Sequence, residues 1–263
     1  MAKIIAIANQ KGGVGKTTTA INLSSCLAHY GQETLLIDMD SQSNATSGLG
    51  IEKEKVKHTI YEVLLEKASI ENILVSTEID WLDLIPANVD LIGAEVELVG
   101  LVSRETRLRK ALNVLGNLYR YILLDCPPSL GLLTVNSLTA AHSVIIPIQC
   151  EYYALEGLGQ LMNTLKLVRE SLNPRLEVEG VLMTMFDGRI NLSFQVVEEV
   201  SKFFKQAVYE TKIPRNVRLA EAPGFGKPVI LYSKDSKGAQ AYLSLTREFL
   251  KRNGVEIDNE RES

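Results

Sequence analysis

The sequence has few cysteines and no long apolar run, and each shortage excludes a class of protein. Its 263 residues include three cysteines, Cys26, Cys126 and Cys150. They form no CxxC pair and no zinc-ligand spacing, so we expect buried, reduced thiols of the kind found in cytosolic proteins. No apolar stretch approaches the ~20 residues that cross a bilayer. The sequence predicts neither a structural zinc site nor a transmembrane helix.

Targeting signals and linkers are also missing. The amino terminus, MAKIIAIANQ, has one lysine and then a strand-like run, which is too short and wrongly ordered for a signal peptide. We therefore expect a cytoplasmic protein. No Pro/Gly/Ser-rich or low-complexity tract divides the chain, so we expect a single domain over residues 1–253 and a polar, frayed tail over 254–263.

The net charge is -4 and the sequence pI is about 5.6. Nucleic-acid-binding domains are usually basic, so this average disfavours a nucleic-acid partner. A net charge is only an average, however, and a local basic patch can oppose it.

Short apolar, β-branched runs recur along the chain with helical patterns between them. The predicted strands are 4–8, 34–38, 82–86, 121–125, 144–148, 178–184 and 207–213, and the predicted helices are 17–30, 155–172, 193–204 and 237–251. Several strands are apolar throughout, as in a parallel sheet that is covered on both faces. The alternation predicts a doubly wound, mostly parallel α/β sheet with helices on both faces. Ligands bind such sheets at the carboxyl ends of the strands.

A glycine-rich loop follows the first predicted strand and has the composition of a phosphate loop. Glycines let the backbone wrap a phosphate and aim successive N–H groups inward, and the following helix adds its N-terminal dipole. Lys16 is expected to reach the β and γ phosphates, and the Thr17 hydroxyl to hold Mg²⁺. The loop predicts ATP and Mg²⁺ as cofactors of a P-loop NTPase-like fold. Its candidate nucleotide-binding residues are Lys11, Gly12, Gly13, Val14, Gly15, Lys16, Thr17 and Thr18.

An ordinary phosphate loop does not require a lysine at its start, yet this one begins with Lys11. The run KGGVGKTT resembles the deviant Walker A signature of the ParA/MinD family of ATPases. In that family the first lysine reaches the nucleotide of the other subunit in an ATP-sandwich dimer. The resemblance extends almost from end to end, through SQSNATSGLG, PIQCEYYALEG and IPRNVRLAEAPGFGKP. One departure is Ser41, where many relatives carry proline.

Three aspartates at the ends of predicted strands complete the expected catalytic set: Asp38 and Asp125 end strands, and Asp40 lies two residues after Asp38. Asp38 and Asp40 lie two residues apart, so in an extended segment they would face the same side. The resemblance assigns water orientation in hydrolysis to Asp40, with Asp38 on the metal side. The run YILLDCPPS has the Walker B pattern, in which Asp125 contacts Mg²⁺ through water. We therefore expect Lys11, Lys16 and Asp40 to be catalytic, and Thr17, Asp38 and Asp125 to serve the metal.

The segment IPRNVRLAEAPGFGKP also resembles the Soj type of chromosomal ParA proteins, and this resemblance implies contacts to adenine and DNA. Pro214 and Asn216 would pack on adenine. Arg189, Arg215 and Arg218 would bind double-stranded DNA without sequence preference; a second basic cluster, 104–110, has no assigned role. With the phosphate loop starting at residue 11, we expect no helix-turn-helix before it.

The resulting hypothesis is a slow switch ATPase for chromosome or plasmid partitioning. Its ATP-bound homodimer would coat the nucleoid and be released by a ParB-type partner, docked near Glu95 and Glu97. Two alternatives remain open. A MinD-like cell-division ATPase would need a basic amphipathic C-terminal helix for the membrane, whereas this tail is acidic, so no membrane partner is expected. A nitrogenase-reductase-like protein would need cysteine ligands between subunits.

Overall fold

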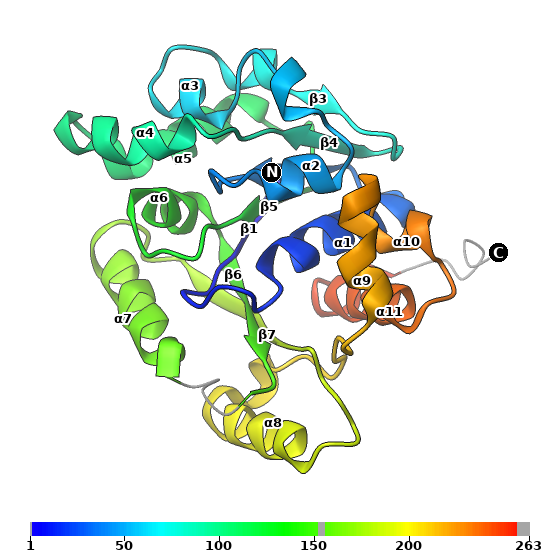
Figure 1. Ribbon diagram of the computed structural model, residues 1–263. Helices are drawn as coiled ribbons and strands as arrows, with labels where there is room; N and C mark the ends of the chain where they lie inside the picture. Colours follow the sequence, from blue (N-terminus) through cyan, green and yellow to red (C-terminus); the bar gives the residue numbers. More distant parts are fainter. Residues whose placement is uncertain (1, 152–155, 257–263) are drawn as a thin grey trace.

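The computed structural model describes residues 2–151 and 156–256 and contains one seven-stranded sheet of order β3-β4-β2-β5-β1-β6-β7 (Figure 1). All neighbouring strands pair in parallel except β3 and β4. The strands are β1 Lys3–Ile7, β2 Thr34–Asp38, β3 Val75–Ser76, β4 Leu82–Ile85, β5 Tyr121–Asp125, β6 Ser143–Gln149 and β7 Glu177–Thr184. The predicted doubly wound α/β sheet is confirmed.

Helices connect the strands and cover both faces of the sheet. They are α1 Lys16–His29, α2 Asn44–Gly48, α3 Ile60–Leu64, α4 Leu91–Glu97, α5 Arg107–Leu112, α6 Leu132–Ala140, α7 Glu156–Ser171, α8 Asn191–Phe204, α9 Val217–Glu221, α10 Val229–Tyr232 and α11 Lys237–Arg252. On one face, α1 and α11 pack together around Leu27, Tyr242 and Phe249 (Figure 1). The other face carries α3 to α6 over one half of the sheet and α6 to α8 over the other half.

The strand order brings the ends of β1, β2 and β5 together. In the ladder, Asp125 at the end of β5 lies opposite both Ile7 of β1 and Asp38 of β2. The loop after β1 and the two aspartates therefore share one edge of the sheet, where α/β folds bind their ligands.

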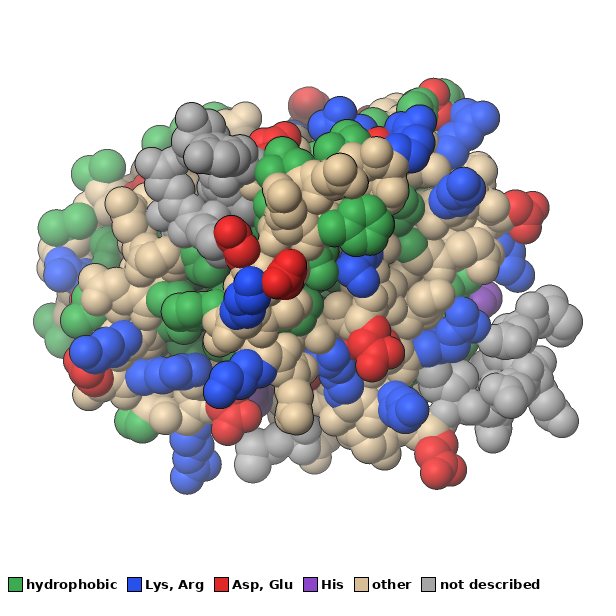
Figure 2. Space-filling model, turned by 90° about the horizontal axis from the view of Figure 1, so that it is seen from below, with side chains coloured by type: hydrophobic (Ala, Val, Ile, Leu, Met, Phe, Trp, Pro, Cys, Tyr) green, Lys and Arg blue, Asp and Glu red, His purple; other side chains and the backbone are tan. Residues whose placement is uncertain are grey.

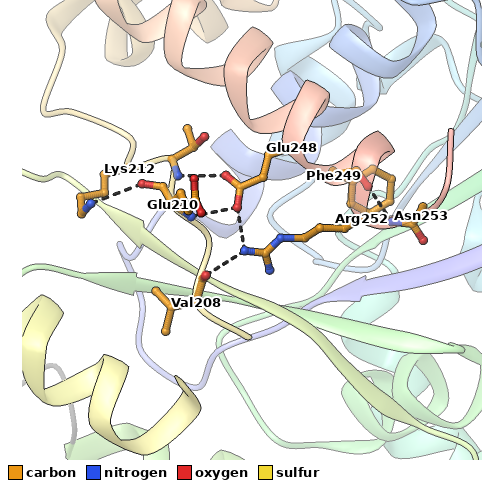
Figure 3. Close-up of polar contacts among 8 residues, drawn as sticks. Val208, Glu210, Lys212, Glu248, Phe249, Arg252 and Asn253 are labelled. Carbon is orange, nitrogen blue, oxygen red and sulfur yellow. Dashed lines mark hydrogen bonds and ion pairs between the residues drawn. The ribbon is translucent and has the colours of Figure 1, made fainter. Parts of the chain in front are cut away.

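The predicted strand at 207–213 is wrong. The segment forms an isolated bridge to β7 between Val208 and Val181, and a second bridge, Pro214 to Phe186, lies just beyond the ends of both. Between the bridges the segment has one more residue than β7, so a regular ladder cannot form. Two of its backbone amides instead donate to Glu248 of α11, as Figure 3 shows.

The other six predicted strands and the four predicted helices are confirmed to within two residues at either end. The two-residue strand β3 was not predicted. It lies antiparallel at the sheet edge, and so short a run has no readable alternation. Residues 257–263 of the predicted tail lie outside the described residues. Within residues 2–151 and 156–256, no helix is both long and apolar enough to span a membrane.

Candidate nucleotide site

The glycine loop between β1 and α1 has the conformation that a phosphate-binding loop requires. Gly13 and Gly15 have φ of 73° and 89°, in the left-handed region that side chains disfavour. The Thr184 hydroxyl donates to the Val14 carbonyl over 2.8 Å and fixes the loop to the end of β7. Gly15 is the N-cap of α1, and no described side chain caps that helix end. The first amides of α1 are therefore free to bind an anion.

The two lysines of the loop have different surroundings. Lys16 is 6% exposed, and its ammonium donates to the Lys11 carbonyl oxygen over 3.0 Å. Burial lowers the pKa of Lys16, although Asp125 opposes that effect. The Lys11 ammonium instead points outward and lies 3.5 Å from the Glu151 carboxylate, with both side chains partly exposed. The loop thus directs one lysine into the site and the other away from it.

Asp125 is fully buried, and neither of its carboxylate oxygens has a hydrogen-bond partner among the described residues. Burial raises its pKa well above the ordinary value, and the nearby Asp38 adds to this, while Thr17 and Lys16 favour the charged form. A buried carboxylate without a partner is costly. A hydrated Mg²⁺ would supply the missing donors, so this donor set fits the predicted metal.

Asp38 is equally buried, but its oxygens already have partners. One accepts the Asp40 amide over 3.1 Å, and the other accepts the amide and the hydroxyl of Thr46 over 2.8 and 2.7 Å. Burial raises the pKa of Asp38 to about 6, against the effect of the Thr46 hydrogen bonds. Asp38 therefore anchors α2 to the end of β2.

The strand ends at Asp38, so the predicted strand alternation does not extend to Asp40. Asp40 is half-buried in the loop after β2, where its side chain accepts the Gln42 amide over 3.0 Å. Together with Asp125, it lies close enough to Lys16 to oppose the lowering of that lysine's pKa by burial. This loop holds Asp40 beside the phosphate loop.

A cavity of about 260 Å³ lies beside the start of α1. Its lining residues are Gly15, Thr18, Thr184, Met185, Ile213, Pro214, Arg215, Asn216, Leu219, Ala220 and Tyr242. Both predicted adenine contacts, Pro214 and Asn216, are in this wall. Asn216 also caps α9 by accepting the Arg218 amide over 3.0 Å. Next to a phosphate loop, a mostly apolar cavity with a few polar groups suits a nucleobase.

Sequence reasoning missed Met185 and Tyr242 in this wall. Tyr242 comes from α11, where its hydroxyl lies 3.1 Å from that of Thr19 of α1. In the sequence it is one apolar residue of a helical pattern, which carries no signal for a binding role. Met185 has a φ of 51° at the end of β7, a conformation that cannot be read from a methionine.

No group of three or more His, Cys, Asp or Glu within the described ranges is arranged to hold a metal ion. The three cysteines are buried and free. Burial raises the pKa of Cys126 to about 12 and that of Cys150 to about 11. They are protonated, unreactive thiols at neutral pH.

The predicted DNA-binding arginines come from two neighbouring segments. Arg189 is 89% exposed and donates to both oxygens of Asp187 over 2.9 and 2.7 Å. These hydrogen bonds lower the pKa of Asp187 to about 2. Arg218 pairs with Glu221 over 2.8 Å, and Arg215 is exposed. Figure 2, seen from the α8 end, shows many Lys and Arg side chains spread across this face, with fewer Asp and Glu side chains among them.

Of the two carboxylates expected to dock a partner, Glu97 has partners within the chain, whereas the buried oxygen of Glu95 has no hydrogen-bond partner among the described residues. Glu97 accepts the Tyr61 hydroxyl over 2.6 Å and lies 3.5 Å from the Lys67 ammonium. One oxygen of Glu95 is buried against Gly131. Most of the basic cluster 104–110 is paired with carboxylates: Arg104 contacts Glu105, and Arg107 and Lys110 contact Glu66. Arg109 instead donates to the Leu172 carbonyl.

Comparison with known proteins gives the family. A model described as an AAA domain matches residues 2–178. The chain is 59% identical to the sporulation initiation inhibitor protein Soj of Bacillus subtilis, over 94% of this chain and 98% of that protein. It is also 59% identical to the chromosome partitioning protein ParA of Myxococcus xanthus, over 96% and 89%. A structure of cobyrinic acid a,c-diamide synthase from Mycobacterium smegmatis with bound ADP and magnesium has a TM-score of 0.84 at 38% identity, covering 98% of both chains. The chain belongs to the Soj/ParA family of chromosome-partitioning ATPases.

Proposed function

We propose that this chain is a switch ATPase that binds ATP with Mg²⁺, dimerises, holds DNA without sequence preference and leaves it after hydrolysis. The observation that carries the proposal is the buried carboxylate of Asp125 beside Lys16 and Thr17, whose oxygens have no hydrogen-bond partner in the part of the chain that the structure describes. Such a group is stabilised by a cation, and a glycine loop at a helix N-terminus is suited to the phosphates that accompany it.

Each residue of the site then has a role. Lys16 would leave the Lys11 carbonyl to reach the β and γ phosphates, the Thr17 hydroxyl would be a ligand of Mg²⁺, and Asp125 would hold the hydrated ion. The amides of residues 12–18 surround the phosphates, and Pro214 and Asn216 contact the base. The Mycobacterium smegmatis structure with ADP and magnesium supports this assignment. Bound Mg²⁺ neutralises charge on the phosphates, while the chain supplies orientation.

Hydrolysis and dimerisation use the two outward groups, Asp40 and Lys11. Asp40 orients the attacking water, and Lys11 reaches the nucleotide of the other subunit. In the isolated chain Lys11 pairs with Glu151 at 3.5 Å, with both side chains partly exposed. A pair of this kind contributes at most about 1 kcal/mol, so dimerisation can release it.

DNA binding uses Arg189, Arg215 and Arg218. Because Asp187 and Glu221 neutralise two of these arginines, one chain offers a weak patch. A dimer doubles the patch, which couples DNA affinity to ATP. A ParB-type protein is the proposed partner, and the bound state would place the protein on the nucleoid.

The test is gel filtration of Asp40→Ala with and without ATP and Mg²⁺, with Asp80→Ala as an exposed control. We expect Asp40→Ala to stay dimeric with ATP because phosphate and metal ligands remain, while the control should dimerise only until its ATP is hydrolysed. DNA retardation should follow the dimer. A chain that stays monomeric with ATP, or a dimer that sediments with anionic vesicles and not with DNA, would contradict the proposal.

A further inference from the structure

The segment that leads from β7 to the base cavity is attached to α11 through one carboxylate. Glu248 accepts the Glu210 amide over 2.8 Å and the Thr211 amide over 2.9 Å, one on each oxygen. The flanking amides, those of Tyr209 and Ile213, donate to carbonyls of β7 over 2.9 Å. Glu248 thus replaces the missing ladder at the point where the segment has its extra residue.

Arg252 lies one helical turn after Glu248 and completes the cluster, as Figure 3 shows. Its guanidinium donates to Glu248 over 2.6 Å and to the Val208 carbonyl over 2.8 Å. It also lies 4.4 Å from the centre of the Tyr209 ring. The Glu248 carboxylate therefore binds two backbone amides of the segment, and the Arg252 guanidinium binds its Val208 carbonyl.

The cluster is built at close quarters. The side chains of Glu248 and Arg252 are 16% and 27% exposed, and Tyr209 is 1% exposed. The ring of Tyr209 fills the space over Gly180, where an added Cβ would lie 2.3 Å from it. Burial alone would raise the pKa of Glu248, but the Thr211 and Glu210 amides and Arg252 outweigh it and lower that pKa. The carboxylate is charged at neutral pH.

This attachment ends two residues before the base cavity. Thr211 is followed by Lys212, and then Ile213 to Asn216 line the cavity. Six residues before Glu248, Tyr242 lines the same cavity from α11. One helix, α11, therefore supplies part of the cavity wall and also holds the segment that leads to residues 213–216, another part of that wall.

We propose that Glu248, supported by Arg252, is a positioning residue for the nucleobase: it holds residues 210 and 211 so that Pro214 and Asn216 meet the base. This inference rests on the proposed ATP site. If it is correct, α11 determines how tightly the base is bound, while the glycine loop determines how tightly the phosphates are bound.

The experiment compares two ligands, ATP and magnesium tripolyphosphate, which shares the phosphates but lacks the base. Glu248→Gln preserves size but places an NH₂ group against a backbone N–H. Its ATP dissociation constant should rise about tenfold or more, the scale of one lost charge-assisted hydrogen bond. The constant for tripolyphosphate should change less than about twofold, within ordinary mutational scatter. Glu198→Gln, which breaks the exposed pair with Lys202 on α8, should change neither.

Hydrogen exchange gives a readout that does not depend on ligand, since the Glu210 and Thr211 amides should lose protection in Glu248→Gln alone. If that variant is too unstable to purify, Arg252→Gln can replace it, because it keeps the hydrogen bonds from the Glu210 and Thr211 amides to Glu248. Arg252→Gln should lose less ATP affinity than Glu248→Gln and should likewise keep its affinity for tripolyphosphate. Equal loss for both ligands, or an unchanged ATP affinity in either variant, would overturn the positioning role. A wild-type chain that binds neither ligand would instead refute the proposed ATP site.

Discussion

At the scale of single residues, the two lysines of the glycine loop should separate binding from dimerisation. Lys16 is buried and faces the site, while Lys11 faces outward. Lys16→Ala should weaken ATP binding at least tenfold, because it removes a charge-assisted contact to phosphate. Lys11→Ala should leave ATP affinity within about threefold but abolish ATP-dependent dimers on gel filtration. Equal losses of monomer affinity would place Lys11 in its own subunit's site.

Asp125 and Asp38 are both fully buried aspartates on neighbouring strands, yet substitution should affect them oppositely. Asp125→Asn removes a carboxylate whose charged form burial disfavours and whose oxygens have no hydrogen-bond partner among the described residues, so unfolding without ligand should require about 1–3 kcal/mol more. Asp38→Asn breaks the bonds to Thr46 and should cost about 1–3 kcal/mol. Urea denaturation of the ligand-free proteins measures both changes.

The same Asp125→Asn variant should lose most of the thermal stabilisation that Mg²⁺ and ATP give the wild type. A binding site often carries such a cost in stability. If Asp125→Asn proved less stable than wild type, the carboxylate would have a structural partner, and the metal assignment would fail.

At the scale of elements, the turn after α2 and the segment after α9 meet through two glycines, Gly50 and Gly226. An added Cβ on Gly226, whose φ is 65°, would lie 2.7 Å from the Cα of Gly50. Gly226→Ala should therefore destabilise the protein by about 2 kcal/mol or more, since both backbone conformation and space oppose it. Gly224→Ala, with nothing within 4 Å, should stay within about 0.5 kcal/mol. Equal denaturation midpoints would show that the contact is not rigid.

Strands and the phosphate loop could be predicted because their signals are local. Continuous apolar runs such as 121–125 and the spacing from Lys11 to Thr18 depend on neighbouring residues alone. The segment at 207–213 also has the composition of a strand, but the prediction of a strand there was wrong because two of its backbone amides donate to Glu248, which is distant in sequence. The roles of Tyr242 and Met185 were missed for the same reason: they depend on how α11 and β7 meet α1.

At the scale of the whole molecule, a chain with a net charge of -4 is proposed to bind DNA, and we expect the dimer to make this possible by doubling the arginine patch. Arg189→Glu and Arg218→Glu should each weaken ATP-dependent DNA retardation to a similar degree on unrelated sequences, because phosphate contacts carry no sequence information. In a plot of the logarithm of DNA affinity against the logarithm of salt concentration, the steepness of the slope should decrease by about 1 for each phosphate that the variant no longer neutralises. Asp187→Asn should instead strengthen ATP-dependent DNA retardation, because it removes the carboxylate that pairs with Arg189. If DNA retardation were unchanged in both charge-reversal variants, the DNA-binding surface would have to lie elsewhere on the protein.

Turnover is also a property of the assembled molecule, and we expect it to be slow for the chain alone. Asp40 is the one clear water-orienting group in the sequence, and no arginine stands in a recognisable finger position. An arginine supplied by a partner is worth ~10³-fold or more in rate. DNA and a ParB-type partner should therefore accelerate hydrolysis together well beyond either alone, because both act on the ATP-bound dimer. Steady-state phosphate release in the four combinations measures this, with Lys11→Ala as a control that cannot respond. Fast hydrolysis by the chain alone, unchanged by DNA or partner, would identify an ordinary ATP-consuming enzyme in place of a switch.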